Sequence, residues 1–162
     1  MRHLALLVLL LAVVRSYDMP VIAAVTVETS PNHLRFGKHH IPQSYLNWIM
    51  MAGARIVPIK YGASEEEIEY ILDRVNGVFF PGGAAGPVDM KDSEFFRTLQ
   101  TVYKIVKHKN DMGINMPIWG ICLGFESLMM LSVNDTNLLK EFSANKYLVP
   151  SMVEMNCLPS LQ

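Results

Sequence analysis

The chain alternates between short apolar runs and longer stretches in which apolar residues recur every three or four positions. Short continuous runs rich in β-branched residues are typical of buried parallel strands. They occupy residues 21–27, 54–59, 78–80 and 117–121. The helical spacing predicts helices over residues 42–52, 64–75, 93–108 and 124–131. Strands and helices therefore alternate along the chain, as in proteins with a parallel sheet.

Local signals set the ends of several elements. Ser64, with Glu67 three residues later, forms the sequence pattern of a capping box at a helix start. Pro42 suits the first residue of a helix, and Gly53 is a typical residue just after a helix end. Pro58 lies near the end of the second strand, where a missing N–H limits how far the strand runs. Residues 30–40 are polar and predict a loop.

The order of elements predicts an α/β fold, a three-layer α/β/α sandwich around a mostly parallel sheet with right-handed crossovers. A length of 162 residues fits one domain, and 51% hydrophobic residues exclude a disordered tail. The formal net charge is -1 and no basic run occurs, so nucleic acid is not an expected partner.

The first sixteen residues have the layout of a secretory signal peptide. Arg2 and His3 form a short positive start, an apolar run follows over residues 4–14, and small residues Val14 and Ser16 suit a cleavage site. The run is too short to span a bilayer. We therefore expect residues 1–16 to be removed and residues 17–162 to form the mature chain. That chain would lie in the secretory pathway without a membrane span, and be secreted or delivered to a lysosome or vacuole.

The loop after the fourth strand carries the strongest chemical signal. Gly120-Ile121-Cys122-Leu123-Gly124 has the spacing of a nucleophile elbow, a sharp strand-to-helix turn that exposes its central side chain. Only glycines fit two residues either side of the nucleophile, because any side chain there would meet neighbouring backbone. The positive end of the following helix favours a thiolate. The alternative interpretation is a buried structural cysteine between packing glycines.

A second glycine loop follows the third strand. Pro81-Gly82-Gly83 would lie at the same sheet edge as the cysteine, because the carboxyl ends of parallel strands meet there. Adjacent glycines let the backbone approach a ligand and present N–H groups. The Leu123 N–H and an N–H of this glycine loop are therefore the two predicted halves of an oxyanion hole for a nucleophilic Cys122.

Two motifs resemble the γ-glutamyl hydrolase family, which has the class I glutamine amidotransferase-like fold. They are FPGG at residues 80–83 and WGICLGFE at residues 119–126, supported by SY at residues 44–45 and AGARIVP at residues 52–58. The resemblance extends over about residues 20–132. Glutamine amidotransferases usually have His-Gln after the elbow, whereas this chain has Phe125-Glu126, as γ-glutamyl hydrolases do.

The resemblance implies hydrolysis of γ-glutamyl bonds in folylpoly-γ-glutamates through a thioester on Cys122, with no metal or organic cofactor. It assigns the oxyanion hole to the N–H groups of Gly83 and Leu123. It also places Gly82, Glu126 and Tyr45 in the substrate pocket. Poly-γ-glutamylated folate is then the expected ligand, with a homodimer as an open alternative. Glu126 could equally be an ordinary polar residue of the first helical turn, and Tyr45 could equally belong to the core.

One part of the family's machinery has no counterpart in this sequence. A cysteine nucleophile needs a base, which in the family is a His followed two positions later by an acidic residue, well after the elbow. No His follows Cys122, and only His39 or His40 lies in a loop at the same predicted sheet edge. We therefore expect the domain to be incomplete at its C-terminus, where residues 146–155, interrupted by Pro150, would hold a further strand.

Two other functions remain open from the sequence. One is a non-catalytic relative that acts as a binding or dimerisation module, and the other is a glutaminase-type amidotransferase domain. Asn134-Asp135-Thr136 is an N-glycosylation sequon in a polar stretch after a helix. A functional Cys122 should stay reduced, so we expect no disulfide between Cys122 and Cys157.

Overall fold

The computed structural model describes residues 19–83 and 92–138. The predicted leader, the further strand in residues 146–155 and Cys157 lie outside these ranges. The strands are β1 (Val21–Val25), β2 (Val27–Glu28), β3 (His39–His40), β4 (Arg55–Ile59), β5 (Gly77–Phe80) and β6 (Ile118–Gly120). The helices are η1 (Pro31–Phe36), a 3₁₀ helix, and the α-helices α2 (Gln43–Met51), α3 (Glu65–Leu72), α5 (Glu94–Asp111) and α6 (Leu123–Val133).

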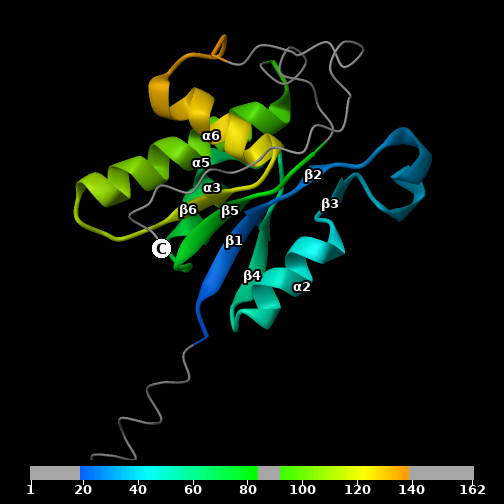
Figure 1. Cartoon of the computed structure of the whole chain (residues 1–162), viewed down its shortest axis with the longest axis horizontal. Helices are drawn as coiled ribbons and strands as arrows, with labels where there is room; N and C mark the ends of the chain where they lie inside the picture. The colour runs from blue at the N-terminus through cyan, green and yellow to red at the C-terminus, as the bar shows by residue number, and fades with distance from the viewer. Residues whose placement is uncertain (1–18, 84–91, 139–162) are drawn as a thin grey trace, which may run out of the picture.

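The main sheet has the strand order β4-β1-β5-β6, and every pairing in it is parallel. This confirms the predicted α/β class. The chain moves from β1 to β4 in one direction and then returns past β1 to β5 and β6 (Figure 1). Because such crossovers are right-handed, the reversal places the connecting helices on opposite faces of the sheet.

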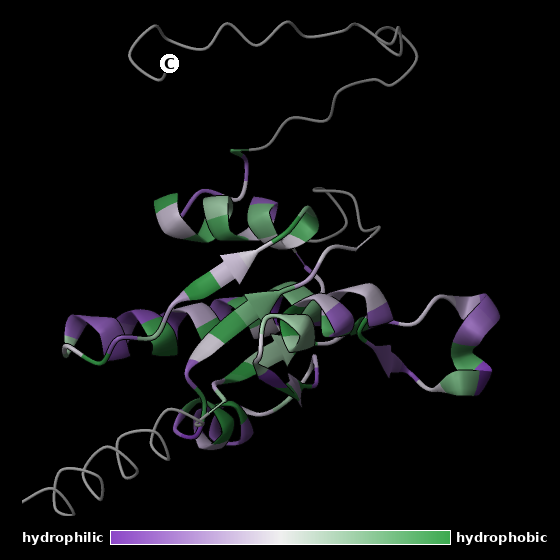
Figure 2. Ribbon diagram, turned by 60° about the horizontal axis from the view of Figure 1, so that its bottom comes forward, coloured by the Kyte–Doolittle hydropathy of each residue, from purple (hydrophilic) through white to green (hydrophobic). Residues whose placement is uncertain are grey.

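Helices cover the two faces unequally (Figure 1). The face carrying α3, α5 and α6 holds a large hydrophobic cluster that includes Val78 and Phe80. The face carrying α2 holds a small cluster that includes Phe79 and Ile49. Successive strand residues point to opposite faces, so Val78 and Phe80 pack on one side and Phe79 on the other. Figure 2 shows the central strands as mostly hydrophobic, as expected for a sheet with helices on both faces.

Pro58 is compatible with β4 because β4 is an edge strand of the described sheet. The Ile59 carbonyl accepts a hydrogen bond from the Thr26 N–H, and the Arg55 N–H donates to the Pro20 carbonyl. Backbone groups alternate in direction along a strand, so the ring nitrogen of Pro58 points away from β1. The missing N–H therefore costs no hydrogen bond within the sheet, and β4 continues to Ile59.

The prediction of one strand over residues 21–27 was wrong for its last two residues, because β1 ends at Val25. The Thr26 N–H still donates to the Ile59 carbonyl of β4, and the Thr26 hydroxyl accepts from the Tyr61 N–H. After Thr26, β2 leaves the main sheet and pairs antiparallel with β3, which lies in a segment predicted to be a loop. The expected loop also contains η1.

The helices follow the predicted pattern with small shifts at their ends. Ser64 and Glu67 form the capping box at the start of α3, which ends at Leu72 rather than at residue 75. Pro42 is the N-cap residue of α2 rather than its first helical residue. In the described ranges, none of the helices combines the length and apolar character that crossing a membrane requires.

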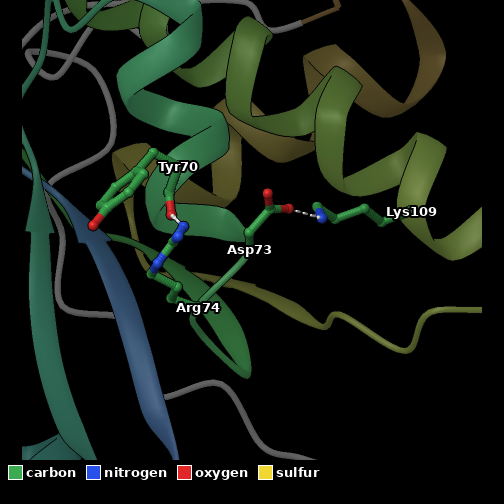
Figure 3. A network of polar contacts seen from close by, with 4 residues as sticks. All are labelled: Tyr70, Asp73, Arg74 and Lys109. Atoms are coloured by element: carbon green, nitrogen blue, oxygen red, sulfur yellow. Dashed lines mark hydrogen bonds and ion pairs between the residues drawn. The ribbon is translucent and has the colours of Figure 1, made fainter.

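An ion pair joins the end of α3 to α5 (Figure 3). Lys109 Nζ lies 2.5 Å from Asp73 Oδ1, and the Asp73 carboxyl has a pKa below its usual range because of this hydrogen bond and the charge on Lys109. Arg74 donates to the Tyr70 carbonyl and lies over the Tyr70 ring. The Asp73–Lys109 pair therefore links α3 to α5 on the sheet face that holds the larger hydrophobic cluster.

Candidate active site at the cysteine elbow

The elbow and the glycine loop lie side by side because β5 and β6 are neighbours. Phe80 is aligned with Gly120 in the sheet, and the Ile121 N–H donates to the Phe80 carbonyl over 3.1 Å. The chain leaving β5 at Gly82 and the chain leaving β6 at Cys122 therefore emerge at the same edge. The structure brings together the two loops that sequence reasoning selected separately.

Cys122 occupies an unusual backbone conformation. Its φ is 52° and its ψ is -119°, whereas left-handed φ values are uncommon for residues other than glycine. It is the N-cap residue of α6, and its side chain is exposed and not in a disulfide with any described residue. A strained residue with an exposed side chain between a strand and a helix is the geometry of a nucleophile elbow.

The glycines on either side of Cys122 are required by close backbone approach. A Cβ on Gly124 would overlap the carbonyl group of Phe80, and a Cβ on Gly120 would lie 2.6 Å from the Gly124 carbonyl oxygen. Contacts this short do not occur between a Cβ and backbone, so only glycine fits. The structure therefore confirms that only glycine fits at Gly120 and Gly124, as the spacing of the elbow predicted.

The glycine loop closes over the other side of the nucleophile. A Cβ on Gly82 would lie 2.5 Å from the Tyr45 hydroxyl and 3.2 Å from Cys122 Cβ, so these two side chains converge on one point beside Gly82. A Cβ on Gly83 would meet Leu123 Cδ2 at 2.8 Å. Leu123 is the first residue of α6, so its backbone N–H has no acceptor within the helix. The loop backbone thus lies against the start of α6.

Tyr45 and Glu126 border the elbow from different elements. Tyr45 lies in α2, is partly buried, and packs edge-on against Phe79 with a centroid distance of 5.3 Å. Glu126 lies in the first turn of α6, and its backbone N–H donates to the Cys122 carbonyl over 2.9 Å. Tyr45 is thus both a core contact, through its ring, and a neighbour of Cys122, through its hydroxyl.

The structure does not bring a histidine to the elbow through any hydrogen bond or ring contact among the described residues. His40 Nδ1 lies 3.3 Å from the Thr29 hydroxyl, and the His39 ring packs on Tyr61 with centroids 4.3 Å apart. His33 contacts Ser30, and His108 lies in the last turn of α5. No group of three or more potential metal ligands forms within residues 19–83 and 92–138.

Sequence reasoning missed an aromatic surface next to the site. Trp119 of β6 is 62% exposed and Trp48 of α2 is 50% exposed, and their ring centroids lie 6.4 Å apart. The Trp48 ring borders Phe79 on one side, with centroids 6.2 Å apart, and half of the residue remains exposed. The signal that could have revealed this exposed surface is that a single helix, α2, is too small to cover the whole of one face of the sheet.

The parallel sheet, the strained cysteine between strand and helix, and the adjacent glycine loop define an α/β protein with a nucleophile elbow. The sequence model of the Peptidase C26 family matches residues 20–133. The chain belongs to this family, which confirms the resemblance drawn from its motifs.

Similar curated proteins carry the name γ-glutamyl hydrolase. Gamma-glutamyl hydrolase B of Dictyostelium discoideum is 33% identical over 135 residues, which cover 82% of this chain and 38% of that protein. Gamma-glutamyl hydrolase of Mus musculus is 37% identical over 122 residues, covering 75% of this chain and 37% of that protein. The chain thus spans less than two fifths of the length of these relatives.

Proposed function

We propose that this protein hydrolyses γ-glutamyl bonds with Cys122 as its nucleophile. The observation that carries the proposal is the strained, exposed Cys122 at the start of α6, facing the loop of Gly82 and Gly83. The relatives named γ-glutamyl hydrolase support the bond type. Poly-γ-glutamylated folate is the proposed substrate, and no metal or organic cofactor takes part.

The proposed reaction has two halves. The Cys122 thiolate attacks the carbonyl carbon of the γ-amide, and the carbonyl oxygen becomes an oxyanion that accepts from the Gly83 and Leu123 N–H groups. The C–N bond then breaks, the leaving nitrogen takes up the proton that the Cys122 thiol lost on ionisation, and the acyl group remains as a thioester on Cys122. Water attacks the thioester and releases the free γ-carboxyl and the thiol.

Substrate contacts are proposed for the groups that surround the nucleophile. The Tyr45 hydroxyl lies beside Gly82 and is placed to donate to a substrate carboxylate or carbonyl. Gly82 lies against Cys122 Cβ, so we propose that its backbone borders the scissile amide. We propose that the carboxylate of Glu126, which lies in the first turn of α6, accepts from the amino or amide nitrogen of a glutamate.

The nucleophile can be tested separately from the base that protonates the leaving amine. A γ-glutamyl ester with an activated leaving group needs no such proton, so it should acylate Cys122 through the elbow and oxyanion hole alone. Intact-protein mass spectrometry should show one γ-glutamyl adduct on the natural chain. Cys122→Ala should abolish it, and Cys157→Ala should keep it. An adduct that persists in Cys122→Ala would contradict the proposal.

Turnover is tested with pteroyl-oligo-γ-glutamate itself. The rate at which the protein releases glutamate should be at least about 10³-fold lower in Cys122→Ala, because removal of the nucleophile removes the covalent route. Release that is unchanged in this variant would rule out Cys122 as the nucleophile.

A non-catalytic binding or dimerisation module is the second candidate. It is favoured by the exposed Trp48 and Trp119, whose rings offer an apolar surface for binding or self-association. It predicts binding of pteroyl-oligo-γ-glutamate, or self-association, with no adduct in the ester experiment. The adduct described above would decide against it.

We also propose entry into the secretory pathway, with residues 1–16 as the cleaved leader and a lysosome, a vacuole or the cell exterior as the destination. The charged start, the apolar run and the small residues before Tyr17 support this route. N-terminal sequencing of the protein from a eukaryotic host should begin at Tyr17. A product that begins at Met1 would contradict it.

A further inference from the structure

The C-terminal end of α6 carries a turn that the proposed mechanism does not use. Asn134 follows Val133 with φ 53° and ψ 37°, in the left-handed region. The Asn134 N–H donates to the Leu131 carbonyl, and the Asp135 N–H donates to the Met130 carbonyl. This pair of bonds is a Schellman motif, in which glycine or asparagine takes the left-handed position. The backbone of Asn134 therefore has a structural role.

The side chain of Asn134 has no such role among the described residues. Asn134 is exposed, and its amide makes no hydrogen bond or ion pair with any residue of the described ranges. Asp135 next to it is exposed and Thr136 is partly buried. These three residues are the only Asn-X-Ser/Thr sequence, with X other than proline, in the entire chain.

We propose that Asn134 is an N-glycosylation site. The proposal rests on the secretory route proposed above and not on the hydrolase activity. In the modification, the Asn134 amide nitrogen forms a bond to the anomeric carbon of an oligosaccharide carried on a lipid diphosphate. The bond between that carbon and the diphosphate breaks, the lipid diphosphate leaves, and the amide loses one proton.

The position suits a bulky polar group in two ways. The helix of eleven residues separates Asn134 from Cys122 by about 16 Å along its axis, so a glycan would leave the elbow open. Three exposed apolar side chains lie close to Asn134 in the sequence, and a sugar would shield them from other molecules. They are Met129 at 38%, Val133 at 53% and Leu138 at 41% exposure.

The test expresses the full chain in a eukaryotic secretory host and measures its mass before and after peptide-N-glycosidase treatment. A second arm replaces residues 1–16 with a leader of known function. Loss of one glycan mass on treatment, with Asn134 converted to Asp in the released peptide, is the expected result. A chain that enters the secretory pathway in the second arm yet shows no enzyme-sensitive mass overturns the site.

Matched variants separate the glycan from the helix cap. Asn134→Gly keeps the left-handed turn and removes the acceptor, and Thr136→Ala removes the acceptor sequence without touching the cap. Both should lose the enzyme-sensitive mass completely, whereas Thr136→Ser should retain it. A mass shift that survives in Asn134→Gly would overturn the assignment.

Discussion

The two faces of the sheet are built differently, and the active-site elbow draws on both. On one face, α3, α5 and α6 bury a large continuous cluster, α3 and α5 begin with a side-chain cap, and the Asp73–Lys109 pair ties the two together. On the other face, α2 has neither a side-chain cap nor a charged residue in its terminal turns. The better-packed face fixes Cys122 through α6, while the less covered face supplies Tyr45.

The difference between the two faces explains why the backbone of Cys122 is held firmly while the tryptophans beside it stay exposed. A strained backbone persists only where its surroundings determine it, and Cys122 is held by Gly124 against the Phe80 carbonyl. Trp48 and Trp119 on the opposite side remain exposed within the described structure. Four experiments can break or sharpen this comparison, from the largest expected effect to the smallest.

Truncation of one aromatic residue on each face gives the widest contrast. Phe96→Ala, at a residue with 0% exposure in α5, should lower the free energy of unfolding by about 3–5 kcal/mol. Trp119→Ala, at 62% exposure, should lower it by about 1 kcal/mol or less. Denaturant unfolding measures both. Equal losses would mean that the face of Trp119 is covered in solution and that the comparison fails.

Gly124→Ala tests how α6 is seated. The added Cβ would overlap the Phe80 carbonyl, so the start of α6 must shift and the free energy of unfolding should fall by about 1–3 kcal/mol. Ester acylation of Cys122 should be lost with it, because the elbow moves. Ser132→Ala, exposed on the same helix, is the control and should stay within about 0.5 kcal/mol of the natural chain. Unchanged acylation in Gly124→Ala would refute this account of the elbow.

Ser64→Ala removes the cap of α3. The Glu67 N–H loses its acceptor, so we expect a loss of about 1 kcal/mol in the free energy of unfolding. Ser44→Ala, at an exposed serine within α2, is the matched change without a cap and should have little effect. If Ser64→Ala and Ser44→Ala lower the free energy of unfolding equally, the cap of α3 adds no stability and is not a difference between the two faces.

Asp73→Asn probes the ion pair between α3 and α5 and has the smallest expected effect. The pKa of Asp73 is lowered in the folded protein by its hydrogen bond to Lys109 and by that charge, so the pair stabilises the fold above the unfolded pKa of about 4. The stabilisation is lost as pH falls through the lower, folded pKa. The stability difference between the natural chain and Asp73→Asn should therefore be present at neutral pH and vanish in acid.

Lys109→Gln is the partner variant for this measurement. If the two groups act as one pair, Asp73→Asn should add little in a chain that already carries Lys109→Gln. A pH-independent difference, or full additivity of the two changes, would contradict the assignment of the shift to this pair.

The sequence by itself determined the order of the four main-sheet strands and the four α-helices, the parallel sheet and the elbow, because each depends on local patterns. Apolar runs, helical spacing, the Ser64 capping box and the glycines around Cys122 all act through near neighbours in the chain. Asn134 was likewise found as a motif.

Only the tertiary structure decided which residues from distant segments meet. The antiparallel pairing of β2 with β3 joins Val27 to His40 and Glu28 to His39, which no local pattern predicts. The edge position of β4 made Pro58 acceptable, and the strand order left Trp119 exposed. The approach of the Tyr45 hydroxyl to Gly82 and Cys122 also arises from packing between elements far apart in sequence. Periodicity specifies which side of an element is apolar, but the partner on that side is fixed only when the elements pack.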